Sequence, residues 1–273
     1  MTAIAPKILR TGLGEVPVFE MGSGPHHVVL LHASSTGPMA FKGLAEHLAR
    51  EERTIVMPAF AGYHGNAIDC SDPFETNCQI AVSVVNSREG DRCTLFGHSM
   101  GGLIATDAVA RGANVDAFAV YEPIVVGALQ QDNNEDMDLL SWDQNIIATL
   151  HAEVAAGRDE AGVAAFVEGW NEVAWSTLPE STRERLVASA PLLVAETRTT
   201  AAAPTPTQRL SALDIPKTVL HGENSPPLAK RLAIRLAERV EGSKLTALDG
   251  VGHMAPVLAP QTVALALEGL LCA

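Results

Sequence analysis

The chain has 273 residues, 47% of them hydrophobic and 19% charged, a composition that excludes a disordered chain and suits one large domain or a core with an insertion. The formal net charge of −13 argues against nucleic acid or an anionic membrane surface as a partner, because little in the chain would neutralise phosphates. We find no signal-peptide pattern and no apolar run of about 18 residues that could cross a bilayer, so we expect a cytoplasmic protein without a membrane partner.

The four cysteines indicate neither a disulfide framework nor a zinc site. Cys70 and Cys78 are close enough in sequence to pair, but Cys93 falls in a predicted buried strand and Cys272 lies near the end of the chain. No Cys-x-x-Cys or Cys/His spacing typical of zinc ligands is present. We therefore expect free thiols and no bound metal.

Strand-like runs alternate with helical ones in the first half of the chain, which is typical of a mostly parallel sheet covered on both faces. An early strand pair is predicted at residues 16–20 and 27–31, with a turn at residues 22–25 between them. Helical patterns follow at residues 41–50 and 72–87, where Asp72 is a suitable N-cap and Pro73 the first helical residue. Further strands are predicted at residues 54–57, 93–96 and 116–121.

The alternation stops between residues 125 and 209. This stretch contains all three tryptophans and helical patterns at residues 139–156, 160–170 and 180–197, but no convincing buried strand. We expect it to form a helical lid (cap) inserted between two core segments, residues 1–124 and 210–273. The core resumes with predicted strands at residues 217–220 and 244–248, a helix at 227–240 and a closing helix from Pro260.

The most informative motif is Gly-His-Ser-Met-Gly at residues 97–101, between a predicted strand and a helical run. A G-x-S-x-G sequence in this context is typical of a nucleophile elbow, a strained turn that exposes the serine and leaves no room for side chains on either side. The following helix N-terminus favours developing negative charge. The motif therefore predicts Ser99 as a nucleophile. No lysine follows the glycines, so a phosphate-binding loop is excluded.

A serine hydroxyl needs a base to accept its proton, and that base is usually a histidine. Of the nine histidines, His253 is the best placed, in the loop between the last predicted strand and the last helix. In a parallel sheet that loop opens at the same edge as the Ser99 turn. The order and the position of the two residues predict that His253 activates Ser99.

Together with His32 after an early strand, these motifs resemble those of the α/β-hydrolase superfamily over nearly the whole chain. The resemblance is closest to its lidded, cofactor-free branch of esterases, haloperoxidase-like enzymes and carbon–carbon-bond hydrolases. It implies the α/β fold class: an α/β-hydrolase fold with a mostly parallel, doubly wound sheet and a helical lid inserted after the sixth strand. It also implies Ser99 as nucleophile, His253 as base and no cofactor.

The same resemblance implies an oxyanion hole built from two backbone N–H groups. One belongs to Met100, the residue after the nucleophile, and we assign the other to Ser34 in the loop after an early strand. The superfamily usually has His-Gly in this loop, whereas this chain has His32-Ala33. The Ser34 or Ser35 hydroxyl is a further candidate donor.

The acid departs from the superfamily pattern, which carries an Asp shortly after the seventh strand. Ser225 occupies that position here. One replacement is Glu122 at the end of the sixth strand, the place from which some haloalkane dehalogenases of the same superfamily supply the acid. The alternative acid is Glu223, next to the usual position. We favour Glu122 and leave open a protein without an acid.

The sequence thus predicts a serine hydrolase that cleaves a carboxylic ester or related acyl bond of a small-molecule, ester-like substrate through a Ser99 acyl-enzyme. A cofactor-free carbon–carbon-bond hydrolase, a lactonase, a perhydrolase and a non-catalytic binding protein of the same fold remain alternatives. The sequence also leaves a homodimer open. The candidate residues of the substrate pocket are His98, Trp142, Trp170 and Trp175.

Overall fold

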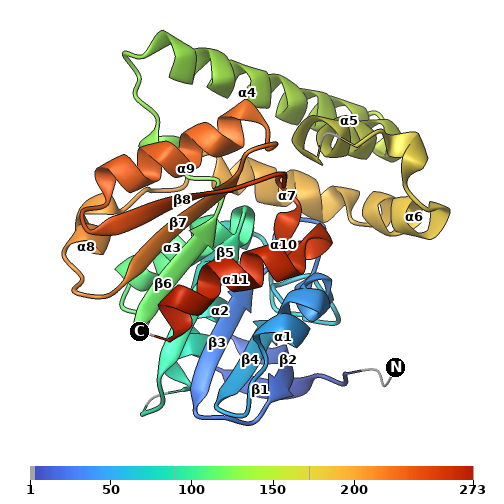
Figure 1. Ribbon diagram of the computed structural model, residues 1–273. Coiled ribbons are helices and arrows are strands. Elements are labelled where there is room, and N and C mark those ends of the chain that lie inside the picture. Colours follow the sequence, from blue (N-terminus) through green and yellow to red (C-terminus); the bar gives the residue numbers. More distant parts are fainter. Residues whose placement is uncertain (1–3, 89, 172, 273) are drawn as a thin grey trace.

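The computed structural model describes residues 4–88, 90–171 and 173–272, which form one eight-stranded sheet, helices on both of its faces and a helical layer above it (Figure 1). The strands are β1 (Lys7–Thr11), β2 (Gly14–Gly22), β3 (His26–Leu31), β4 (Arg53–Pro58), β5 (Cys93–His98), β6 (Ala117–Tyr121), β7 (Lys217–Gly222) and β8 (Ser243–Leu248). The α-helices are α1 (Lys42–Leu48), α2 (Pro73–Asn86), α3 (Met100–Ala110), α4 (Asn134–Ala155), α5 (Asp159–Asn171), α6 (Glu180–Ala188), α7 (Ala190–Thr200), α8 (Thr207–Ser211), α9 (Pro227–Arg239), α10 (Ala255–Leu258) and α11 (Pro260–Leu271). Three short 3₁₀ helices are η1 (Pro38–Phe41), η2 (Val126–Ala128) and η3 (Trp175–Thr177).

The sheet has the strand order β1-β2-β4-β3-β5-β6-β7-β8. All neighbours from β4 to β8 run parallel, whereas β2 is antiparallel to both β1 and β4. Every residue of β3 and of β5 is buried, as expected for central strands that are covered on both faces. The predicted mostly parallel, doubly wound sheet is confirmed.

The predicted early strand pair is wrong, because β4 lies between β2 and β3. The short connection between the two strands suggested a hairpin. Neighbouring strands lie only about 4.8 Å apart, however, and each extended residue spans about 3.4 Å. The few residues of this connection therefore reach across one strand. The edge strand β1 was not predicted, because its residues are mostly exposed and carry little apolar alternation.

Successive residues of the strands contribute to two hydrophobic clusters on opposite faces of the sheet. In β3, Val28 and Leu30 belong to the cluster under α1 and α11, whereas Val29 and Leu31 belong to the cluster under α2, α3 and α9. The helix α2 begins as predicted, with the Asp72 side chain accepting a hydrogen bond from the Glu75 N–H at 3.1 Å. All four cysteines are free, as expected.

The segment between β6 and β7 is helical and, in its described part, contains no strand. Its helices α4 to α7 lie on the side of the sheet towards which the parallel strands point (Figure 1). They share a third hydrophobic cluster, with Leu150, Val163, Trp175 and Leu193 among its buried members. Within the described ranges, no helix is both long and apolar enough to cross a membrane.

Candidate active site

Ser99 lies on the sharp turn between β5 and α3. Its φ of 56° and ψ of −119° belong to neither helix nor strand, the kind of strained backbone that clusters at functional sites. A Cβ on Gly97 would overlap the backbone of Gly101, and a Cβ on Gly101 would overlap the carbonyl oxygen of Leu31 in the neighbouring strand β3. The prediction that close packing requires these glycines is therefore confirmed.

We expect Gly101→Ala to lower the free energy of unfolding by about 3 kcal/mol, because β3 and α3 must separate to admit the methyl group. Urea unfolding followed by circular dichroism measures the change. Gly269→Ala is the matched control, because Gly269 lies on the exposed side of α11 with no atom near the added methyl group. That substitution should leave stability unchanged or raise it by up to about 1 kcal/mol. An unfolding midpoint at the wild-type value in Gly101→Ala would contradict the close approach.

His253 lies in the loop between β8 and α10, and its ring joins Ser99 to Glu122. His253 Nε2 is 3.2 Å from Ser99 Oγ, and His253 Nδ1 is 2.6 Å from Glu122 Oε2. An Nδ1–H that donates to Glu122 leaves Nε2 free to accept a proton from the serine hydroxyl. All three side chains are buried, with 8%, 5% and 0% exposure for Ser99, His253 and Glu122. The structure thus brings the three residues into one hydrogen-bonded chain.

Glu122 follows β6 in a conformation that is rare for residues other than glycine, with a φ of 45°. Its two carboxyl oxygens have different partners. Oε2 lies against His253, and Oε1 accepts a hydrogen bond of 2.7 Å from the Gly222 N–H at the end of β7. A fully buried carboxyl group costs free energy unless it is hydrogen-bonded, and here both oxygens are engaged.

The alternative acid, Glu223, points elsewhere. It is exposed, and its Oε2 accepts a long hydrogen bond of 3.4 Å from the Gly250 N–H. Among the described residues, no hydrogen bond or ion pair joins it to His253. Ser225, at the superfamily's usual acid position, is buried. Of the two predicted carboxyl groups, Glu122 is the one that the fold places on the histidine.

Two side chains of the sheet hold the loop that carries His253. Tyr121 Oη donates to the Gly252 carbonyl oxygen at 2.8 Å, and His98 Nε2–H donates to the His253 carbonyl oxygen at 2.8 Å. Burial lowers the pKa of His98 well below its usual value, which keeps its ring neutral. The prediction that His98 lines the substrate pocket is wrong, because its fully buried ring packs behind His253 instead. No sequence motif indicates this supporting role of Tyr121 and His98.

The loop after β3 passes the N-terminus of α3. Ser34 Oγ donates to Met100 Sδ at 3.2 Å, so the two residues predicted to form the oxyanion hole lie together. Met100 is the first residue of α3, and the backbone N–H at that position has no acceptor within its own helix. Ser34, Met100 and Ser99 all line the same cavity.

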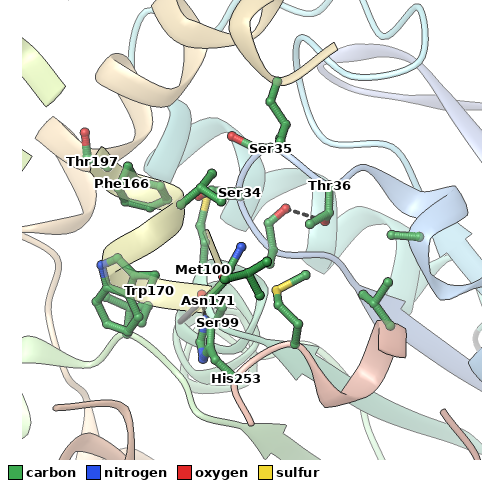
Figure 2. A pocket seen from close by; sticks show the side chains of 18 of the residues that line it. Ser34, Ser35, Thr36, Ser99, Met100, Phe166, Trp170, Asn171, Thr197 and His253 are labelled. Carbon is green, nitrogen blue, oxygen red and sulfur yellow. Dashed lines mark hydrogen bonds between the residues drawn. The ribbon is translucent and has the colours of Figure 1, made fainter. Parts of the chain in front are cut away.

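This cavity has a volume of about 250 Å³ and opens onto Ser99 and His253 (Figure 2). Figure 2 shows Phe166 and Trp170 on one side of it and the loop of Ser34 on the other. Its wall comes from both the core and the helical layer and is mainly apolar, with Ile124, Ile147, Phe166, Val167, Trp170 and Leu186 among the apolar residues. Such a cavity suits a small, largely apolar ligand.

Of the three tryptophans, all within the described residues, Trp170 alone lines this cavity. Its ring packs on the His253 ring with centroids 5.2 Å apart. Trp142 packs against Trp170 with centroids 5.9 Å apart, and Trp175 is buried in the third hydrophobic cluster. The pocket prediction is therefore wrong for Trp142 and Trp175, which pack the helices of the layer together.

One acidic side chain, Asp143 of α4, belongs to the wall of the cavity. Its Oδ1 accepts a hydrogen bond of 3.1 Å from Trp170 Nε1, which fixes the indole ring above His253. Burial raises the pKa of Asp143 to about 6. Among residues 4–88, 90–171 and 173–272, no three His, Cys, Asp or Glu side chains are grouped so as to hold a metal ion.

Comparison with known families and structures agrees with this geometry. The model of the alpha/beta hydrolase family matches residues 28–266, a range that contains Ser99, Glu122 and His253. The chain belongs to the alpha/beta hydrolase family. No curated protein matches its sequence.

Solved structures with the α/β-hydrolase fold match nearly the whole chain. An alpha/beta hydrolase from Sphaerobacter thermophilus is 21% identical with a TM-score of 0.72, over 97% of this chain and 99% of its own. An esterase from Exiguobacterium antarcticum is 17% identical with a TM-score of 0.75, over 98% of this chain and 100% of its own. A bromoperoxidase from Bacillus anthracis is 16% identical with a TM-score of 0.74, over 99% of each chain. At these identities the similarity establishes the shared fold.

Proposed function

We propose that the protein is a serine hydrolase that cleaves a carboxylic ester or related acyl bond of a small molecule through an acyl-enzyme on Ser99. The observation that carries this proposal is the hydrogen-bonded chain from Ser99 through His253 to Glu122, which opens onto an apolar cavity. A serine, a histidine and a carboxyl group in this order can activate the hydroxyl for attack on a carbonyl carbon.

In the proposed reaction, His253 Nε2 takes the proton of Ser99 Oγ as the oxygen attacks the substrate carbonyl. Glu122 stabilises the resulting imidazolium through Nδ1–H. The backbone N–H groups of Met100 and Ser34 are the proposed donors to the oxyanion of the tetrahedral intermediate. His253 then protonates the leaving group, and the same residues activate water to release the acyl group.

We further propose that residues 125–209 act as a lid over the core formed by residues 1–124 and 210–273. The helical layer supplies Phe166, Val167 and Trp170 to the cavity wall and has a hydrophobic cluster of its own. A lid that excludes water strengthens hydrogen bonds to developing charge inside the site. The mainly apolar wall favours apolar acyl groups.

The solved structures of the same fold and the geometry of the site bear on the other candidate activities. The esterase among the solved structures of the same fold agrees with ester hydrolysis, and the bromoperoxidase keeps perhydrolysis as an alternative for this chain. A non-catalytic binding protein is less well supported. Such a protein would not need the buried carboxyl group of Glu122, which lies 2.6 Å from His253. Carbon–carbon-bond and lactone hydrolysis would use the same three residues.

Labelling with a fluorophosphonate probe tests the proposal directly. Wild-type protein should take up the probe on Ser99 and cleave 4-nitrophenyl esters of short or medium chain length. His253→Ala should lose both activities by at least about 1000-fold, because no other base lies at hydrogen-bond distance from Ser99 among the described residues. His151→Ala is the matched control, since His151 bonds to Thr197 in the helical layer and not to the serine. A folded wild type that takes up no probe and cleaves no ester would contradict the proposed function.

A further inference from the structure

The loop that carries the proposed oxyanion donor Ser34 is held first by the core. The Ala33 carbonyl oxygen accepts hydrogen bonds from His32 Nδ1–H at 2.9 Å and from Thr36 Oγ1 at 2.7 Å. His32 Nε2 in turn accepts from the Phe60 N–H at 3.3 Å, and burial lowers the pKa of His32 to about 3, so its ring stays neutral. The C=O and N–H of a trans peptide point in opposite directions. These bonds therefore set the direction of the Ser34 N–H.

The next two peptides of the loop are held from the helical layer. The Ser35 N–H donates to Tyr63 Oη at 2.8 Å, and Tyr63 Oη donates to Glu196 Oε1 in α7 at 2.8 Å. The Ser35 carbonyl oxygen accepts from Arg185 Nη1 in α6 at 2.8 Å. Both main-chain polar groups of Ser35 are thus tied to α6 and α7, one directly and one through Tyr63.

Ser35 itself needs such restraint. Its φ of 60° lies in the left-handed region, which costs free energy for a residue with a side chain. Glu196 is fully buried and Tyr63 is 8% exposed, so these hydrogen bonds are protected from water. Burial also raises the pKa of Glu196 to about 7 and that of Tyr63 well above its usual value, so the tyrosine remains a phenol that can both accept and donate. The carboxyl oxygen accepts from Tyr63 in either protonation state of Glu196.

We propose that Glu196, Tyr63 and Arg185 are positioning residues that hold the oxyanion loop in place, so that the helical layer takes part in catalysis and does more than cover the cavity. This inference rests on the proposed function. Tyr63 and Glu196 are not part of the cavity wall, whereas Arg185 also lines the cavity. Loss of the Tyr63 or Glu196 hydrogen bond should weaken stabilisation of the tetrahedral intermediate while leaving the Ser99–His253–Glu122 chain and the binding of the substrate intact.

Tyr63→Phe is the central test, because it removes one hydroxyl group and leaves the Ser35 N–H without its acceptor. We expect kcat for a 4-nitrophenyl ester to fall about 10- to 100-fold with KM within about threefold, since a displaced oxyanion donor affects the transition state alone. Inhibition by an alkylboronic acid, which forms a tetrahedral adduct on the serine, should weaken by a similar factor. Binding of the matching uncleaved amide should not change.

Glu196 provides a pair of variants that separate its hydrogen bond from its packing. Glu196→Leu removes the acceptor for Tyr63 and should lower kcat as Tyr63→Phe does, whereas Glu196→Gln keeps an acceptor oxygen and should recover kcat to within about threefold of the wild type. Thr199→Val is the control on the same helix, because within the described part of the chain the Thr199 hydroxyl donates only to carbonyl oxygens of α7. Thermal unfolding verifies that each variant is folded.

The outcomes separate a failure of the positioning role from a failure of the proposed serine hydrolase function. A wild type that cleaves ester and takes up probe, with Tyr63→Phe and Glu196→Leu at the wild-type kcat, overturns the positioning role alone. A rise in KM for the substrate with a matching rise in the dissociation constant of the uncleaved amide also overturns it, because the loss would then lie in binding. A wild type without esterase activity or probe uptake overturns the proposed function and this inference with it.

Discussion

Ser99→Ala should leave the protein folded and lower the turnover of 4-nitrophenyl esters by at least about 10⁴-fold. The substitution removes the atom that His253 Nε2 faces at 3.2 Å, and no covalent acyl-enzyme can form without it. Alanine is smaller than serine and fits the tight turn, so the loss should lie in kcat rather than in stability. Steady-state kinetics and thermal unfolding of the same preparation measure the two effects.

Ser189→Ala is a matched control for this variant. The Ser189 hydroxyl donates to the Leu186 carbonyl oxygen within the helical layer, away from the cavity. We expect turnover within about twofold of the wild type for this change. Ester cleavage at the wild-type rate in a folded Ser99→Ala protein would exclude the acyl-enzyme mechanism.

The second large effect concerns the acid. Glu122→Gln should lower kcat by at least about 100-fold, because an amide can hold the wrong tautomer of His253 and cannot stabilise the imidazolium. The amide oxygen can still accept from the Gly222 N–H, so the fold should survive. Glu223→Gln makes the same chemical change at the exposed alternative site and should change kcat by less than about tenfold. Kinetics of the two variants, side by side, measure the contrast.

A reversed result would be informative. If Glu223→Gln were the damaging change, Glu223 and not Glu122 would be the acid, and the hydrolase proposal would stand. If neither variant lost activity, the serine and the histidine would act without a carboxyl group, and the proposed role of Glu122 would be excluded.

The parts of the site that the sequence predicted depend on local constraints. Gly97 and Gly101 signal the elbow because their Cα atoms approach other backbone too closely for any side chain. His253 could be placed because the loops after parallel strands share one edge of the sheet. Glu122 was a candidate because a charged residue directly after a buried strand needs a partner.

The parts that the sequence did not predict depend on contacts between distant segments. Tyr63 and Glu196 lie 133 positions apart, and nothing in the sequence near either residue indicates that the Tyr63 hydroxyl contacts the Glu196 carboxyl group. The face of α5 that turns towards the cavity is decided by how α4 to α7 pack together, so Trp170 could not be separated from Trp175 by spacing alone. In the same way, the place of β4 between β2 and β3 is a property of the assembled sheet.

The position of Glu122, the proposed acid, at the end of β6 also constrains how the proposed lid can move. The proposed lid begins at Val125, three residues after Glu122, and the preceding Ile124 N–H donates to the Ser99 carbonyl oxygen at 3.2 Å. Val125 is fully buried, so this first connection is anchored beside both Ser99 and Glu122. Displacement of the proposed lid at this end would move Ser99 and Glu122 away from His253. We therefore expect residues 122–125 to stay in place when the proposed lid opens. An opening that moved α6 and α7 would break the Tyr63–Glu196 and Arg185–Ser35 hydrogen bonds, so access to the cavity and the position of the proposed oxyanion donor would change together.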